Sequence, residues 1–295
     1  MTQEVGSAGI DSVTLVSIFV ESVLYGLFIV LFIASTIIQL RKSRGQGNAL
    51  NRPMLIASFT MFVLATVHIA IDLRRALTAF IGSAGRGGPI ALLGQVNAPT
   101  YLLKNGAYVV QALVGDAFII YRLNLVWNGN KLVVYPVLVS FIASIGVGIG
   151  ALQEVGRASP DASVFVASIQ HWIASLFTLT LLTNFSSTTL IAFRIWSTHR
   201  QTKDIVGSGR GILPAMVVII ESGSIYSACL VILLSLYLLG SYAQYIVLDA
   251  VTQIIGAVFS LIIVRVALGI SSETTSNQIK MTTFRVAGIE DGTRV

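Results

Sequence analysis

The stretch VTLVSIFVESVLYGLFIVLFIASTIIQL, residues 13–40, contains a single charged residue, Glu21. A helix of that length crosses about 30 Å of hydrocarbon, because each residue adds about 1.5 Å along the axis. The preceding residues, MTQEVGSAGIDS, are acidic, and the apolar run is longer than the core of a cleavable signal peptide. We therefore expect a membrane-spanning helix that is retained as a signal anchor.

Six further runs of the same kind follow, and few charges separate them. Only 11% of the 295 residues are charged and the mean hydropathy is +0.83, whereas soluble domains carry about a quarter charged residues. The runs lack the alternation of barrel strands. We predict an all-α polytopic membrane protein, a bundle of seven transmembrane helices within residues 1–270, and a polar, disordered cytosolic tail at 271–295. The expected spans are 13–40, 53–73, 101–127, 132–152, 166–196, 212–239 and 243–268.

Basic residues predict the orientation of the bundle. Fourteen of the nineteen Lys and Arg residues fall on the side that holds the C-terminus, and five fall on the other side. The positive-inside rule then places the N-terminus outside and the C-terminus in the cytosol. This topology explains the net charge of +6, so we predict no nucleic-acid partner. The expected partner is the lipid bilayer.

A first set of ionisable residues is expected near the outer ends of the spans. Such groups are costly at membrane depth and normally find partners inside the bundle. His68 and Asp72, spaced i and i+4, share a helix face and can hydrogen-bond, while Lys104 and Arg74 or Arg75 can balance the acids. The set is either an outward-opening pocket for a cationic or hydroxyl-bearing ligand or a structural network. Its members are Glu21, His68, Asp72 and Asp249.

A second set lies toward the cytosolic side. Asp116 and Arg122 are six residues apart and do not share a helix face, so Asp116 needs another partner. Glu221 and Arg265 lie at suitable depths, and we expect these four residues to form a neutral interhelical cluster. Such a cluster either holds the packing of the helices or acts as the bistable element of a switch.

No metal or cofactor site is predicted. His68 is expected near the outer end of one span, His171 at the outer end of another, and His199 in the cytosol. The three histidines therefore cannot converge on one ion. Small residues in the span at 132–152, among them Gly148 and Gly150, predict close approach of a neighbouring helix.

Three motifs resemble a large family of uncharacterised seven-span integral membrane proteins of basidiomycete fungi. They are DAFIIYRLNLVW at 116–127, ESGSIY at 221–226 and IVRVALG at 263–269. The resemblance covers all seven spans and implies a fold and a lineage, but no activity. It also implies that Asp116, Arg122, Glu221 and Arg265 are the polar signature of the family.

The layout is receptor-like, with an outer N-terminus and a basic loop, THRQTKDIVGSGRG at 198–211, between the fifth and sixth spans. This layout predicts a small-molecule ligand from the outer side, a cytosolic partner at that loop, and residence in the plasma membrane or an endomembrane. The last span lacks a lysine, which excludes a retinal Schiff base. Alternatives are a membrane-embedded enzyme that uses the buried carboxyls of Glu221 and Asp116, for example terpene-cyclase-like, or a transporter of protons or small solutes.

Overall fold

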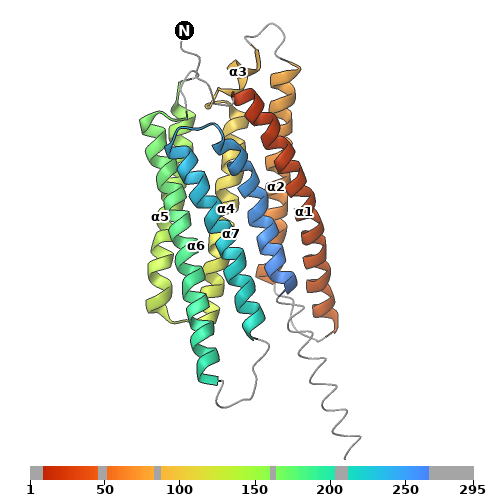
Figure 1. Cartoon of the computed structure of the whole chain (residues 1–295), viewed down its shortest axis with the longest axis vertical. Helices are drawn as coiled ribbons and strands as arrows, with labels where there is room; N and C mark the ends of the chain where they lie inside the picture. Colours follow the sequence, from red (N-terminus) through yellow and green to blue (C-terminus); the bar gives the residue numbers. More distant parts are fainter. Residues whose placement is uncertain (1–8, 46–51, 83–87, 160–163, 203–211, 266–295) are drawn as a thin grey trace, which may run out of the picture.

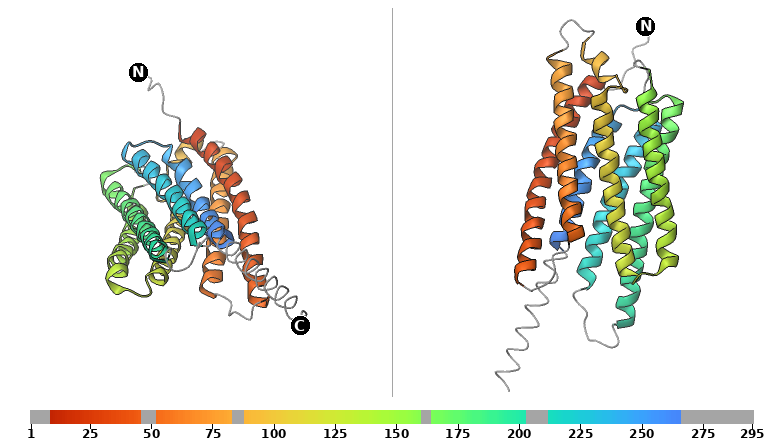
Figure 2. Two further views of the ribbon diagram at one scale, coloured as in Figure 1. Left: turned by 60° about the horizontal axis from the view of Figure 1, so that its bottom comes forward. Right: turned by 180° about the vertical axis from the view of Figure 1, so that it is seen from behind.

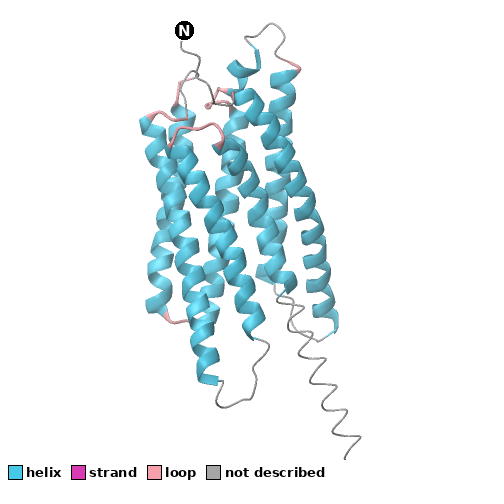
Figure 3. Ribbon diagram, viewed as in Figure 1, coloured by secondary structure: helices cyan, strands magenta, loops and turns pink. Residues whose placement is uncertain are grey.

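The computed structural model describes residues 9–45, 52–82, 88–159, 164–202 and 212–265. Within these ranges the chain consists of helices joined by short loops, and no strand occurs (Figure 3). The predicted all-α class is therefore confirmed. The expected disordered tail at 271–295, and most of the basic loop at 198–211, lie outside the described residues.

Seven of the helices are long and apolar enough to cross a membrane, as predicted. The described helices are α1 (Ile10–Gly45), α2 (Arg52–Phe80), α3 (Gly88–Leu93), α4 (Pro99–Val126), α5 (Lys131–Arg157), α6 (Ala167–Thr202), α7 (Ile212–Leu238) and a last span, Gln244–Arg265. The short helix α3 is too short to span, and it lies between the predicted spans at 53–73 and 101–127. Helices α2 and α5 each continue beyond the predicted ends at 73 and 152, because hydropathy locates only the apolar part of a helix.

The helices run lengthwise in one bundle (Figures 1 and 2). Helix α1 begins at the end of the bundle that carries α3, and the last span ends at the opposite end (Figure 1). We refer to these as the outer and the inner end, following the predicted orientation. Helix α4 packs against α2, α5 and α6, so it connects α2 with the pair α5 and α6.

The bundle has large apolar side chains on its surface and charged or amide side chains in its interior, which is the opposite of a soluble protein. Large apolar side chains such as Phe19, Val139 and Phe185 are 71%, 66% and 62% exposed. Charged and amide side chains, Glu21 and Gln111 among them, are fully buried. Lipid is the solvent in which an apolar exterior of this extent is stable, because the bilayer core offers no water to the surface.

Small residues allow the close helix contacts that hold the bundle. A Cβ atom on Gly150 of α5 would overlap the Trp172 ring of α6, and one on Gly256 of the last span would overlap the ring of Phe28 in α1. At the inner end, Asn128 and Gly129 adopt φ angles of 50° and 74° and turn the chain from α4 into α5. Positive φ at these positions favours Asn and Gly.

Candidate functional site

Five ionisable side chains from four helices meet near the outer end of the bundle. We call them the outer cluster: Glu21 of α1, His68 and Asp72 of α2, Lys104 of α4 and Asp249 of the last span. Their side chains are between 0% and 8% exposed. The structure thus brings together all four residues of the predicted outer set, together with the lysine proposed to balance them.

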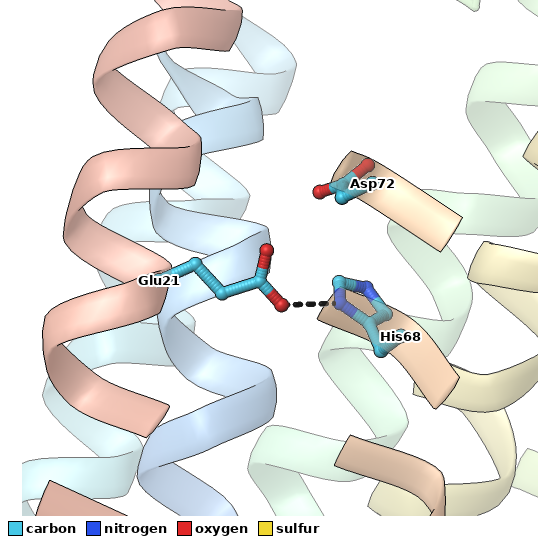
Figure 4. Close-up of side chains that lie close together, drawn as sticks. All are labelled: Glu21, His68 and Asp72. Atoms are coloured by element: carbon cyan, nitrogen blue, oxygen red, sulfur yellow. Dashed lines mark hydrogen bonds and ion pairs between the residues drawn. The ribbon is translucent and has the colours of Figure 1, made fainter. Parts of the chain in front are cut away.

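The imidazole of His68 connects α2 to α1. Its Nδ1 lies 2.7 Å from Oε1 of Glu21 (Figure 4). The same Glu21 oxygen accepts a hydrogen bond of 2.9 Å from Nε2 of Gln253 in the last span. Although His68 and Asp72 share a face of α2, as predicted, the structure gives each of them a partner on another helix instead of a bond to each other.

The ammonium of Lys104 is shared by two carboxylates. Its Nζ donates to Oδ2 of Asp72 at 2.6 Å and lies 2.7 Å from Oδ1 of Asp249. The other oxygen of Asp249 accepts a hydrogen bond from the hydroxyl of Ser17. One cation therefore joins α2, α4 and the last span, and Ser17 adds α1 to the network.

The cluster contains more acidic than basic groups. Three carboxyls face one ammonium, with the imidazole of His68 as the other group that can carry a positive charge. Arg75 lies beside the cluster, but its guanidinium donates to the hydroxyl of Thr100 at 3.2 Å and stacks over the Tyr101 ring. Arg75 therefore forms no ion pair with the carboxyls of the outer cluster in the described structure.

Three polar atoms of the outer cluster are buried without a hydrogen-bond partner. They are Oε2 of Glu21, Nε2 of His68 and Oδ1 of Asp249, the last of which forms the ion pair with Lys104 at 2.7 Å. The His68 nitrogen lies 3.8 Å from Oδ1 of Asp249, which is longer than a hydrogen bond. An unpaired buried polar atom is costly, so the network has unused capacity for a ligand or for a small shift of the helices.

A cavity of about 30 Å³ adjoins the cluster on its outer side. Carboxylates of Asp72 and Asp249 and cationic groups of Arg75 and Lys104 line it, together with the hydroxyl-bearing Ser17. This volume accommodates about one or two water molecules. In the conformation described, the cavity therefore admits only a small group.

Three residues of the outer cluster lie close enough together to be considered as ligands of a metal ion. Glu21, His68 and Asp72 each offer a ligand atom, and these atoms lie within 4.8 Å of one another. The ammonium of Lys104, however, already contacts Asp72 at 2.6 Å, and it would repel a divalent cation bound there. The donor set therefore fits an internal ammonium better than a metal ion.

The predicted inner cluster does not form as a single unit. Glu221 and Arg265 do pair, at 2.9 Å, but their side chains are 51% and 43% exposed at the surface of the bundle. Asp116 is fully buried, and neither of its carboxylate oxygens has a hydrogen-bond partner. Arg122 stacks over the Phe118 ring, with 5.5 Å from its Cζ to the ring centroid.

The expected four-residue cluster was wrong because depth along a helix does not determine which way a side chain faces. Gly115 and Arg122 lie on the side of α4 that packs against α2 and the last span. Asp116 is rotated from Gly115 by about 100° around the helix axis, so its side chain leaves α4 in another direction. Asp116 and Glu221 also lie in different surroundings, one fully buried and one half-exposed. Glu221 and Asp116, the two carboxyls named for the enzyme alternative, are therefore not in the same environment in the described structure.

Neutral polar residues complete the outer network, and the sequence analysis did not single them out. Ser17 and Gln253 bond directly to Asp249 and Glu21, and Gln111 of α4 donates to the carbonyl of Thr252. A glutamine inside an apolar run was the available signal, since a buried amide needs a partner.

Comparison of the chain with protein-family models, with curated proteins and with solved structures finds no match. The resemblance to the fungal seven-span family therefore stays a prediction, and the functional conclusion depends on the geometry of the outer cluster.

Proposed function

We propose that this seven-transmembrane protein is receptor-like and that its outer cluster is the ligand-responsive element. The observation that carries the proposal is a buried acidic excess, with unpaired atoms, beneath a cavity at the outer end. In this proposal a small organic cation enters from the outer side. Its ammonium group supplies a second ion-pair partner for the carboxyls, because Arg75 lines the cavity but donates to Thr100 instead.

The position of the cluster supports a response to ligand rather than simple binding. Its residues belong to α1, α2, α4 and the last span, so a change in pairing alters the contacts among four helices. Lys104 is the connection to the inner end, because it lies on α4, which packs against α2, α5 and α6 and continues to the turn before α5. A ligand that competes with Lys104 for Asp72 or Asp249 would shift the equilibrium between two packings of these helices.

The first test is ligand-dependent stabilisation of the purified protein in nanodiscs. Small ammonium compounds are compared with neutral compounds of the same shape, and the unfolding midpoint is measured against concentration. We expect a saturable rise for the ammonium member of a pair, because binding to the folded state alone stabilises it. The rise should be lost in Asp249→Asn and retained in Glu154→Gln, which alters an acidic residue of α5 outside the cluster.

The second test asks whether binding changes the inner end. An environment-sensitive fluorophore is placed on Lys131→Cys, an exposed position at the start of α5, in a Cys229→Ser background. A ligand that stabilises the protein should change the emission with the same concentration dependence. Saturable binding without such a change would contradict the receptor assignment, and uptake of the ligand into vesicles would then indicate a transporter. Absence of saturable stabilisation would contradict the ligand site itself.

A further inference from the structure

A second cavity lies in the inner half of the bundle, away from the outer cluster. It measures about 60 Å³ and lies among α4, α7 and the last span, with contributions from α2 and α6. Its walls are mainly apolar, as at Phe118, Ile255 and Phe259. Among its lining residues, Arg122 is the one that carries a formal charge.

The guanidinium of Arg122 lacks a counter-ion in the described part of the chain. Its Nη1 atom is buried without a hydrogen-bond partner, and its guanidinium stacks over the Phe118 ring. Arg122 lies four residues before the inner end of α4 at Val126, or about 6 Å along the helix axis. Arg122 is partly buried, and an anion from outside the described chain would be stabilised next to its buried, unpartnered Nη1 atom.

A second unused donor faces the same cavity. Tyr226 of α7 is 5% exposed, its hydroxyl has no hydrogen-bond partner, and it lines the cavity together with Arg122. A buried tyrosine hydroxyl normally has a partner. The cavity therefore combines two unsatisfied donors, one of them charged, with apolar walls.

We infer that this inner cavity binds the carboxylate of a long-chain fatty acid, with Arg122 as the counter-charge and Tyr226 as a second donor. A carboxylate matches the single charge of the guanidinium and its planar fork of donors. Its head group and first methylenes suit a cavity of about 60 Å³, whereas a phosphate monoester would bring nearly two negative charges. The remaining chain extends along the apolar walls toward the bilayer.

Binding is tested with oleate on the purified protein in detergent micelles, by equilibrium competition against a fluorescent fatty acid. Oleyl alcohol, which has the same chain without the charge, and lysophosphatidate are the comparison compounds. We expect saturable oleate binding that weakens about tenfold or more in Arg122→Gln, the loss typical of a charge-assisted hydrogen bond. Arg122→Lys retains the charge but loses the planar fork of donors, so it should weaken oleate binding less than Arg122→Gln does. The matched control is Arg194→Gln, because Arg194 stacks over Trp127 and does not line the cavity.

Several outcomes would overturn the assignment. They are oleyl alcohol binding as tightly as oleate, equal binding in Arg122→Gln and wild type, or preference for lysophosphatidate over oleate. A photoreactive fatty acid provides a readout that does not depend on a variant. Cross-links should concentrate on peptides of α4, α7 and the last span, and be displaced by oleate. Cross-links that persist in excess oleate or concentrate on lipid-facing positions such as Phe19 would show partitioning into the lipid annulus, which also contradicts a site. These measurements involve no outer-cluster residue, so they are independent of the proposed receptor function.

Discussion

Replacement of Lys104 by methionine tests the central interaction of the outer cluster. Methionine retains most of the apolar stem of the side chain but removes the ammonium that lies 2.6 Å from Asp72 and 2.7 Å from Asp249. The two carboxylates, 6% and 2% exposed, are then left in the bundle without this cation. Removing one partner of a buried ion pair costs about 3–5 kcal/mol. Because the two pairs share one ammonium, we count this cost once.

The expected loss corresponds to a fall of about 6–20 °C in the unfolding midpoint, at about 2–4 °C per kcal/mol. The assay is thermal unfolding of the purified protein in detergent micelles, followed by circular dichroism. Lys131→Met is the matched control, because Lys131 is exposed at the start of α5. A fall in Lys104→Met no larger than that of the control would refute the reasoning.

The double variant Lys104→Met/Asp72→Asn separates the ion pair from other effects of substitution. Removing both partners leaves one fewer uncompensated charge, so the double variant should be more stable than the sum of the single losses predicts. In Lys104→Met alone, methylammonium should restore part of the midpoint if the outer cavity gives small cations access to Asp72 and Asp249. Additive losses, with no effect of methylammonium, would show that the three groups do not act together.

Three further substitutions probe the remaining features, each by its unfolding midpoint. Glu221→Gln should cost less than about 1 kcal/mol, because the pair with Arg265 is half-exposed; a larger loss would show that this pair is a structural anchor. Gly256→Ala should cost about 1–3 kcal/mol, because the added methyl group overlaps the Phe28 ring. Gly26→Ala has open space at its Cβ position and should be neutral or stabilising by up to about 1 kcal/mol. Equal effects of the two substitutions would contradict the tight contact at Gly256. Asp116→Asn should leave stability nearly unchanged, because neither oxygen of this buried carboxyl has a hydrogen-bond partner that the amide would lose; a marked fall would indicate that the carboxyl has a stabilising role.

The seven spans could be predicted from the sequence because the hydrocarbon imposes a minimum length on every apolar run. The run at 13–40, for example, lies within α1, Ile10–Gly45. Depth along each helix also predicted which ionisable residues meet at the outer end. There the charged groups of four helices lie close to a common level, and hydrogen-bond requirements bring them together once the helices pack.

Partners could not be predicted from depth alone. His68 and Asp72 share a helix face, yet each bonds to a different neighbouring helix, because rotation and packing of the helices decide which groups meet. Asp116 and Glu221 were placed at compatible depths, but one faces the interior and the other lies at the surface. Sequence separation provides no information on such rotations unless the neighbouring helices are already known.

The order in which the ribosome delivers the spans has a consequence for assembly. Ser17 and Glu21 belong to the first helix, but their partners Asp249 and Gln253 follow 232 residues later. A nascent chain that has inserted only its earlier spans would hold Glu21 and Lys104 in the bilayer without Gln253 and Asp249. Such an intermediate is a natural target for membrane chaperones, and a product truncated before the final helix should be degraded rather than accumulate.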